Sequence, residues 1–179
     1  MKIVLLPESW RERALIVSEV DDLESWFEEV DLAQMRSFAR PKRQKEWMLS
    51  RIAEKELRRR GTQGSCISFS HSGIFGAAAI DDQPVGIDVE TLREISERAA
   101  HLFLKEQEIE SMRRCAIPHR MLHFWSAKEA LWKQRGGSVP TLKRVPLLFA
   151  GHTENGLRFQ GVETIATGDL IAALTLPTS

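Results

Sequence analysis

The side chains best suited to chemistry in this sequence belong to two short acidic motifs near the middle of the chain. The first motif is residues 86–90, GIDVE, and the second is residues 124–133, FWSAKEALWK. Side chains alternate between the two faces of a strand, so Asp88 and Glu90 would share one face of the first motif. Residues four apart share a side of a helix, so Glu129 and Lys133 would point the same way from the second motif.

Three carboxylates and one ammonium group would meet if the helix of the second motif lies beside the strand of the first. Such a cluster of carboxylates is unfavourable unless a cation neutralises it. Oxygen donors suit Mg²⁺, which keeps part of its water shell and shares the rest with substrate phosphates. Taken alone, Asp88 and Glu90 could instead be the polar face of an exposed strand end. Glu129 and Lys133 could likewise be an ordinary ion pair on a helix surface.

Together the two motifs resemble the signature of the phosphopantetheinyl transferases, specifically the longer type that activates peptide and polyketide synthetases. The family pattern is Gly-x-Asp-x-Glu followed by Trp-Ser/Thr-x-Lys-Glu-Ala/Ser-x-x-Lys. The positions that match it are Gly86, Asp88, Glu90, Trp125, Ser126, Lys128, Glu129, Ala130 and Lys133. A third segment, residues 67–73, ISFSHSG, resembles the Ser-His-Ser stretch that precedes the acidic strand in these enzymes.

The resemblance implies that the protein transfers the 4′-phosphopantetheine arm of coenzyme A to a serine of an acyl or peptidyl carrier protein, which converts the apo carrier to the holo form. Asp88, Glu90 and Glu129 would hold Mg²⁺ against the pyrophosphate. Glu129 and Lys133 would be the catalytic residues. Lys133 would offset charge on the transferred phosphate, and either Glu129 or a metal-bound water would take the serine proton. A basic or apolar rim beside the cleft would dock the acidic carrier protein.

The same resemblance assigns coenzyme A binding to basic and polar side chains on both sides of the acidic strand. The expected contacts are Arg43, Arg51, Ser70, His71, Lys128 and Lys133. Arg43 and Arg51 lie two helical turns apart and are the candidates for the adenosine 3′-phosphate, with His71 beside them. The family's Gly-Lys-Pro stretch, which contacts adenine, is replaced here by residues 61–65, GTQGS. The adenine contacts are therefore unassigned, and lost or narrowed activity is an alternative.

The composition indicates a cytoplasmic protein and argues against a general nucleic-acid or membrane binder. Lys+Arg and Asp+Glu both total 25 in 179 residues, of which 42% are hydrophobic. Acids dominate residues 8–31 and bases dominate residues 36–60, so the basic segment needs an anionic neighbour: the acidic segment, a phosphate ligand or an acidic partner. Cys66 and Cys115 lack paired spacing and indicate reduced thiols. No apolar run suits a signal peptide or a membrane span.

Two rival classes of function stay open. The basic segment at residues 36–60 could form a nucleic-acid-binding helix, in which case the affinity would fall steeply with salt and would not depend on Mg²⁺. A catalytically silent homologue could also bind a carrier protein without modifying it. For the transferase itself we expect a monomer, because both sides of the coenzyme A site can come from one chain.

The pattern of apolar residues predicts an α+β protein without the regular alternation of a parallel sheet. Helices are expected at residues 42–60, 95–103, 105–114 and over the second motif, and strands at 3–6, 66–70, 75–80, 86–90, 145–150, 157–162 and 170–176. The strands from 66 to 90 would form an antiparallel meander. The resemblance implies two pseudo-symmetric lobes, each a small antiparallel sheet packed with a long helix. We expect residues 1–85 to grip the coenzyme A phosphates and residues 86–179 to carry the metal-binding and catalytic motifs.

Overall fold

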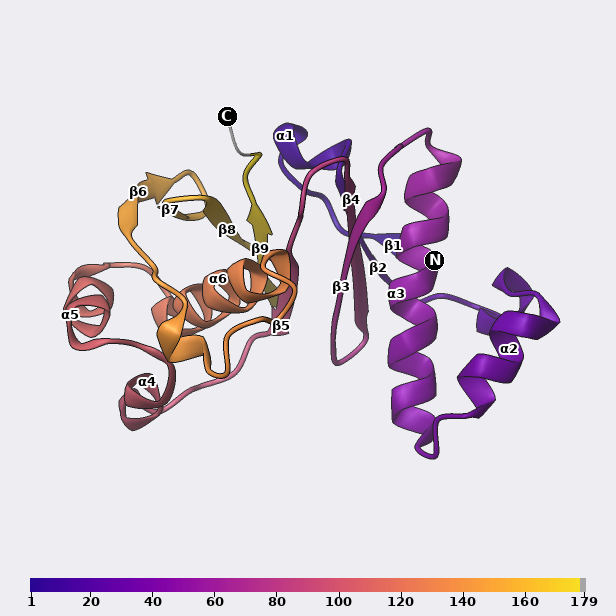
Figure 1. Ribbon diagram of the computed structural model, residues 1–179, viewed down its shortest axis with the longest axis horizontal. Helices are drawn as coiled ribbons and strands as arrows, with labels where there is room; N and C mark the ends of the chain where they lie inside the picture. The colour runs from indigo at the N-terminus through magenta and orange to yellow at the C-terminus, as the bar shows by residue number, and fades with distance from the viewer. Residues whose placement is uncertain (178–179) are drawn as a thin grey trace.

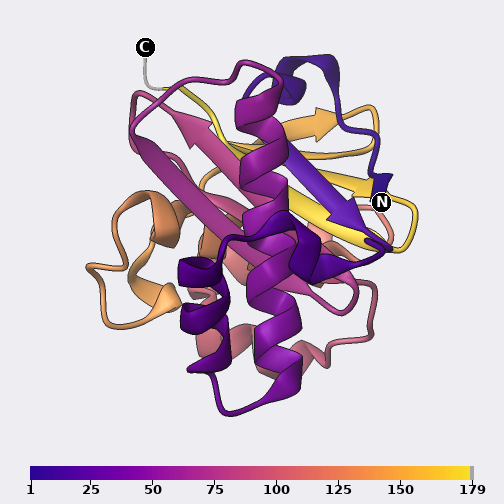
Figure 2. The same cartoon turned by 90° about the vertical axis from the view of Figure 1, so that its right-hand side faces the viewer.

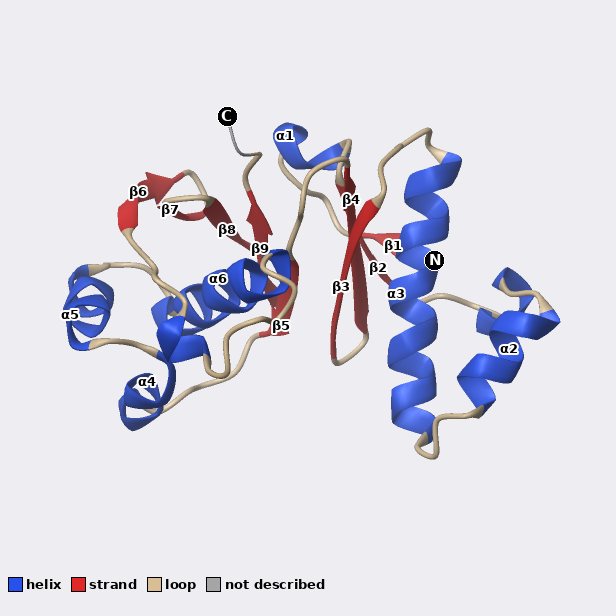
Figure 3. Ribbon diagram, viewed as in Figure 1, coloured by secondary structure: helices blue, strands red, loops and turns tan. Residues whose placement is uncertain are grey.

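Two antiparallel sheets with helices on their outer faces make up an α+β fold, as the sequence predicts. The computed structural model describes residues 1–177. One sheet has the strand order β1-β2-β4-β3, and the other has the order β5-β9-β8-β7-β6. The two sheets lie side by side in the middle of the molecule, with α3 on one outer side and α6 on the other (Figures 1 and 3).

The first sheet comes from the N-terminal part of the chain. Its strands are β1 (Lys2–Ile3), β2 (Ala14–Ser18), β3 (Cys66–Ser72) and β4 (Phe75–Asp81). The long helix α3 (Pro41–Arg59) lies across these strands, as Figure 2 shows. Proline at its first position loses no helical hydrogen bond, and Gly61 follows its end with φ of 95°. Helix and sheet share an apolar core of Leu15, Val17, Leu49, Ile52, Ala53, Leu57, Ala78 and Ile80.

Three short helical segments complete this part of the protein. They are α1 (Glu8–Arg11), a 3-10 turn (Leu23–Trp26) and α2 (Glu29–Arg36). Helix α2 packs beside Trp47 and Met48 of α3, and Lys55 Nζ lies 3.0 Å from an Asp31 carboxylate oxygen. The acidic segment is therefore one anionic neighbour of the basic helix.

The second sheet begins with the acidic strand. Its strands are β5 (Ile87–Thr91), β6 (Phe149–Thr153), β7 (Gly156–Phe159), β8 (Val162–Thr167) and β9 (Leu170–Thr175). Its helices are α4 (Glu97–Phe103), α5 (Glu106–Arg114) and α6 (Arg120–Gln134), with a 3-10 turn at Leu142–Arg144. Helix α6 carries the second motif and packs on the sheet around Phe124, Phe159 and Val162.

Gly86 brings the backbones of β5 and α6 into close contact. A Cβ atom at this position would lie 1.8 Å from the carbonyl oxygen of Ala130. Only glycine fits, because any side chain would push the strand away from the helix. This approach places the two acidic motifs side by side.

A further apolar core joins the two sheets. The first sheet contributes Ala14, Ile16, Ala77 and Ala79, and the second contributes Ile87, Val89, Ala172 and Leu174. Ile87 and Val89 of β5 thus face the first sheet. Asp88 and Glu90 alternate with them, as the strand period requires, and contact side chains of α6.

The structure corrects three strand predictions. The segment at 3–6 is not a buried strand: β1 is short and exposed, and the buried strand is β2, which the sequence pattern does not predict. The meander is wrong, because β5 leaves β4 and pairs with β9 in the other sheet. The run at 157–162 is two strands, because the chain turns at Gly161 with φ of 81°.

The connection between β4 and β5 contains the boundary expected near residue 86, and the division into two lobes there stays a prediction. Within residues 1–177, every helix is too short or too polar to cross a membrane.

Candidate active site

A cavity of about 310 Å³ lies where α3 and β3 meet β5 and α6. It is lined by Arg43, Trp47, Ser50, Arg51, Phe69, Ser70, His71, Asp88 and Lys133. Six of these are residues that the sequence analysis selected for metal, phosphate or catalytic roles. The cavity therefore brings cationic side chains of the first sheet's half together with the acidic strand and the motif helix of the second.

The acidic wall of the cavity centres on Asp88, which is 5% exposed. Its Oδ1 accepts hydrogen bonds from Lys133 Nζ and from Ser70 Oγ, both at 2.9 Å. Lys133 Nζ also donates to the carbonyl oxygen of Ile87 at 3.0 Å. The second oxygen, Oδ2, is buried and has no hydrogen-bond partner among the described residues. An unpaired buried carboxylate oxygen is costly, so this atom calls for a further cation or donor.

Glu90 and Glu129 are not among the residues that line the cavity, but their charges interact with the charge of Asp88. Glu90 accepts a hydrogen bond from Trp125 Nε1 at 2.8 Å and one from Arg93 at 3.2 Å. Burial, and then the charge of Asp88, raises the pKa of Glu90. The same two causes, in the same order, raise the pKa of Glu129. The three carboxylates are thus close enough for their charges to repel one another.

The chemistry of these carboxylates fits a divalent cation, although no three acidic, histidine or cysteine side chains of residues 1–177 are already grouped as metal ligands. Asp88 Oδ2 is free of hydrogen bonds, and bound Mg²⁺ would relieve the repulsion that raises the pKa of Glu90 and of Glu129. All the donors are oxygen atoms, as Mg²⁺ prefers. In this structure the ammonium group of Lys133 supplies the positive charge next to Asp88.

The basic wall of the cavity contains Arg43 and His71. Arg43 Nη1 donates a hydrogen bond to His71 Nε2, and His71 Nδ1 lies 3.6 Å from Glu46. Burial lowers the pKa of His71, with the charge of Glu46 acting in the opposite direction. A neutral imidazole accepts the Arg43 proton at Nε2 and holds its own proton at Nδ1, toward Glu46. The outer face of Arg43 stays accessible, because its side chain is 49% exposed.

Arg51 lies on an aromatic surface at the same wall. Its guanidinium carbon is 3.8 Å from the centroid of the Phe69 ring and 5.7 Å from that of Trp47. Its Nη1 donates to Glu54 at 3.1 Å. These contacts fix the plane of the guanidinium group, so Arg51 offers the cavity a preorganised cation.

Lys128 does not reach the cavity. Its side chain is fully buried, and Nζ lies 2.7 Å from a Glu108 carboxylate oxygen and 2.8 Å from the carbonyl oxygen of Val145. Lys128 and Lys133 are five residues apart, so they leave α6 on different sides. This placement corrects the prediction that Lys128 contacts coenzyme A phosphates.

Two further cavity residues could have been predicted from their spacing along the helix. Trp47 and Ser50 lie between Arg43 and Arg51 on one side of α3, at steps of three and four residues. Extending the face of the two arginines would have selected them. Glu46, which orients His71, carries no such signal because its contact depends on β3 lying beside α3.

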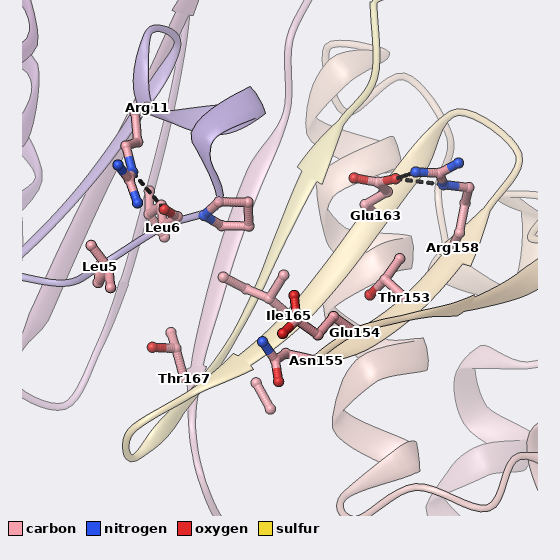
Figure 4. Close-up of a pocket in the computed structure, with 12 residues that line it drawn as sticks. Leu5, Leu6, Arg11, Thr153, Glu154, Asn155, Arg158, Glu163, Ile165 and Thr167 are labelled. Atoms are coloured by element: carbon pink, nitrogen blue, oxygen red, sulfur yellow. Dashed lines mark hydrogen bonds and ion pairs between the residues drawn. The ribbon is translucent and has the colours of Figure 1, made fainter.

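A larger cavity, of about 440 Å³, lies between the N-terminal segment and strands β6 to β8 (Figure 4). Three of its four charged groups are already engaged: Arg158 pairs with Glu163, and Arg11 donates to the carbonyl oxygen of Leu6 at 2.7 Å. None of the residues in the two acidic motifs lines it. Two further cavities, of about 580 and 550 Å³, also contain no residue of these motifs, so the cavity beside Asp88 is the candidate active site.

Comparison with known proteins finds similarity to one family over part of the chain. Residues 84–167, which include both acidic motifs, match the model of the 4′-phosphopantetheinyl transferase superfamily. The 4′-phosphopantetheinyl transferase psf-1 of Bacillus pumilus is 33% identical over 75 residues, and Sfp of Bacillus subtilis (strain 168) is 35% identical over 72 residues. These matches cover 40% and 38% of this chain and 32% of each relative. Over residues 84–167 the chain is therefore similar to the 4′-phosphopantetheinyl transferase superfamily, in agreement with the resemblance of its two acidic motifs.

Proposed function

We propose that the protein transfers the 4′-phosphopantetheine arm of coenzyme A to a serine hydroxyl of an acyl or peptidyl carrier protein. One observation carries the proposal: a single cavity joins Asp88 and Lys133 to Arg43 and His71. A carboxylate suited to a divalent cation, that of Asp88, thus lies in the same cavity as cations suited to phosphates. The names of the relatives describe the same transferase activity.

The reaction is a phosphoryl transfer, in which positioning and charge neutralisation supply most of the catalysis. The serine oxygen forms a bond to the β-phosphorus of coenzyme A, and the phosphoanhydride bond breaks to release adenosine 3′,5′-bisphosphate. When bound by Asp88, Glu90 and Glu129, Mg²⁺ supplies positive charge to the pyrophosphate.

Glu129 accepts the proton of the attacking serine in this proposal. Burial, and then the charge of Asp88, raises the pKa of Glu129 in the metal-free protein. With a cation bound, the carboxylate oxygen that does not hold the cation is the one that can accept the proton. Within residues 1–177 its carboxylate takes part in no hydrogen bond that would hold it away from a substrate. A water molecule between Glu129 and the serine would serve the same proton transfer.

Lys133 and the basic wall bind the phosphates. The Lys133 ammonium group lies on the cavity side of Asp88, where it can offset charge on the transferred phosphate. Arg43 and His71 lie on the opposite wall and bind the adenosine 3′-phosphate in this arrangement. Their mutual contact is replaced by charge-assisted hydrogen bonds to the phosphate oxygens.

We propose no nucleic-acid partner for the basic helix, because acids neutralise much of its charge. Arg59 and Arg60 both pair with Glu56, at 2.7 and 2.9 Å. Arg51 and Arg58 both approach Glu54. A nucleic-acid surface would instead present such cations unpaired.

We further propose that the protein acts as a monomer in the cytoplasm. Both walls of the cavity come from one chain, so a second copy is not needed to complete the site. Cys66 and Cys115 are free thiols, as is usual in a reducing compartment.

The test is incubation with coenzyme A, Mg²⁺ and an unmodified carrier protein, followed by intact-mass measurement of the carrier. We expect the mass to rise by one phosphopantetheine group, and EDTA to prevent the rise. Carrier binding without a mass change would indicate a catalytically silent homologue. Salt-sensitive binding to nucleic acid, together with an unchanged carrier, would support the rival reading of the basic helix.

A further inference from the structure

Three alternate serines of β3 bind the backbone of β5. Ser68, Ser70 and Ser72 accept hydrogen bonds through their hydroxyl oxygens from the backbone N–H groups of Ile87, Val89 and Thr91, at 3.1, 3.2 and 3.0 Å. Each serine binds the residue nineteen positions later in the chain. We call these three serines the serine ladder.

The serine ladder supplies hydrogen-bond acceptors to N–H groups at the edge of the second sheet. β5 is the edge strand of the second sheet and pairs with β9 on one side only. The outward N–H groups of an edge strand have no partner within their own sheet. Here the hydroxyl groups take the place of backbone carbonyls, because serines at every second position of β3 share one face of that strand.

The ladder also fixes which side chain of β5 enters the cavity. A strand that slips by one residue turns every side chain to the opposite face. In the observed register Asp88 lies between Ile87 and Val89, whose N–H groups are held by Ser68 and Ser70. Ser70 in addition donates to Asp88 Oδ1 at 2.9 Å.

The same register sets the position of Lys133. Its ammonium group donates to the carbonyl oxygen of Ile87, and the N–H group of Ile87 donates to Ser68. Ser68 is 6% exposed and does not line the cavity. A change at Ser68 therefore reaches Asp88 and Lys133 through the backbone of β5, or along β3 through the contact of Ser70 with Asp88.

We propose that Ser68 and Ser72 are positioning residues, which hold β5 in register so that Asp88 and Lys133 face the cations of α3 and β3. The catalytic part of this inference rests on the proposed transferase function. The structural part does not, because it concerns hydrogen bonds that can be measured without substrate.

The test compares Ser68→Thr with Ser68→Val. Threonine and valine have nearly the same shape, so both variants add the same volume and only threonine keeps the hydroxyl group. Hydrogen exchange followed by NMR measures the exchange rate of the Ile87 amide proton. We expect this rate to be about tenfold higher in Ser68→Val than in Ser68→Thr, because valine cannot accept the hydrogen bond. Equal exchange in the two variants would overturn the ladder itself, whatever the activity of the protein.

The catalytic readout uses the same pair of variants at saturating coenzyme A. We expect Ser68→Val to lower kcat about tenfold relative to Ser68→Thr, since a small displacement of catalytic groups is costly. The KM for coenzyme A should change less than kcat does, because Arg43 and His71 on the basic wall are unchanged and only the phosphate contact of Lys133 is displaced. Equal kcat values alongside unequal exchange would show that the ladder stabilises the fold without positioning the site.

Ser72 provides the second pair if the buried Ser68 variants do not fold. It is only partly buried and binds both the N–H group of Thr91 and, at 3.2 Å, the Thr91 hydroxyl oxygen. Ser72→Val should speed exchange of the Thr91 amide relative to Ser72→Thr, while the Leu174 amide in β9 serves as an internal reference. Unchanged exchange at Thr91 would overturn the inference. Absence of any transferase activity in the wild-type protein would instead refute the proposed function and leave the exchange result intact.

Discussion

Lys133 reaches from the last turn of α6 to Asp88 on β5, with 2.9 Å between Nζ and Oδ1. This ion pair joins the two acidic motifs, and it leaves Asp88 Oδ2 buried without a hydrogen-bond partner in residues 1–177. One oxygen of this aspartate therefore binds a fixed cation, and the other is buried and free of hydrogen bonds. The predictions that follow depend on this arrangement.

Asp88→Asn should reduce kcat/KM for carrier modification by about a thousandfold or more, because it removes a charged oxygen at the centre of the site. The protein should remain folded, since asparagine keeps the shape of aspartate and can still accept from Ser70 and Lys133. Steady-state kinetics at saturating Mg²⁺ measures the loss. Asp82→Asn is the matched control, because Asp82 is exposed in a turn and should behave as wild type. Near wild-type turnover by Asp88→Asn would remove Asp88 from the active site.

Glu129→Gln should stabilise the metal-free protein at pH 7 while preventing transfer. Burial and Asp88 raise the pKa of Glu129, so the folded protein binds this proton more tightly than the unfolded chain. Stability is therefore lost as pH rises from the usual glutamate pKa through the raised one. The variant avoids this loss and should gain about 2–4 °C in Tm for each kcal/mol of relieved repulsion.

Thermal unfolding at two pH values checks this account of Glu129. The gain in Tm should be present at pH 7 and should vanish below the usual glutamate pKa, where the wild-type side chain is also neutral. Glu106→Gln, at a side chain that is 79% exposed, should give no such gain. A Tm difference that is independent of pH would contradict the assignment of the effect to the Glu129 charge.

Arg43 and His71 should recognise the 3′-phosphate of coenzyme A. Loss of this phosphate should weaken binding by about 1.5–3 kcal/mol, as expected for charge-assisted hydrogen bonds. Arg43→Ala and His71→Ala should weaken the binding of coenzyme A but should barely change the binding of 3′-dephospho-coenzyme A. Calorimetry with Mg²⁺ present gives the coupling as a thermodynamic cycle. A coupling energy of zero for both residues would show that neither Arg43 nor His71 contacts the 3′-phosphate.

Lys128→Met should destabilise the protein without altering coenzyme A binding. The substitution leaves Glu108 buried without its cation, and breaking a buried pair in this way costs about 3–5 kcal/mol. Glu108 also accepts from the backbone N–H groups of Lys105 and Leu147, so its carboxylate cannot simply leave the core. Urea unfolding measures the loss, and calorimetry below the unfolding range should give an unchanged Kd. A weaker Kd with unchanged stability would place Lys128 at the ligand after all.

The acidic half of the site could be predicted because its geometry is local. Strand alternation puts Asp88 and Glu90 on one face, and helical spacing does the same for Glu129 and Lys133. The position of Lys128 could not be predicted in this way, because it depends on Glu108, which comes from another helix. A motif thus identifies the residues, while tertiary packing decides which of them reach the cavity.

The fold was predictable to a similar extent. The long helix α3 and the hairpin of β3 and β4 follow from their apolar periods and turn residues. The strand β2 did not stand out, since Ala14–Ser18 is a short apolar run between charged segments. The change of sheet at β5 depends on β9 and on the serines of β3, which are contacts between segments far apart in the chain.

The central claim is that this cavity supports transfer of phosphopantetheine to a serine. The most direct measurement is a single-turnover reaction with coenzyme A and Mg²⁺, in which a carrier protein is compared with a variant whose acceptor serine is replaced by alanine. We predict that the first carrier gains the mass of one phosphopantetheine group, with an equal amount of adenosine 3′,5′-bisphosphate released, and that the second gains nothing. An unchanged mass for the first carrier, or equal modification of both carriers, would contradict the account.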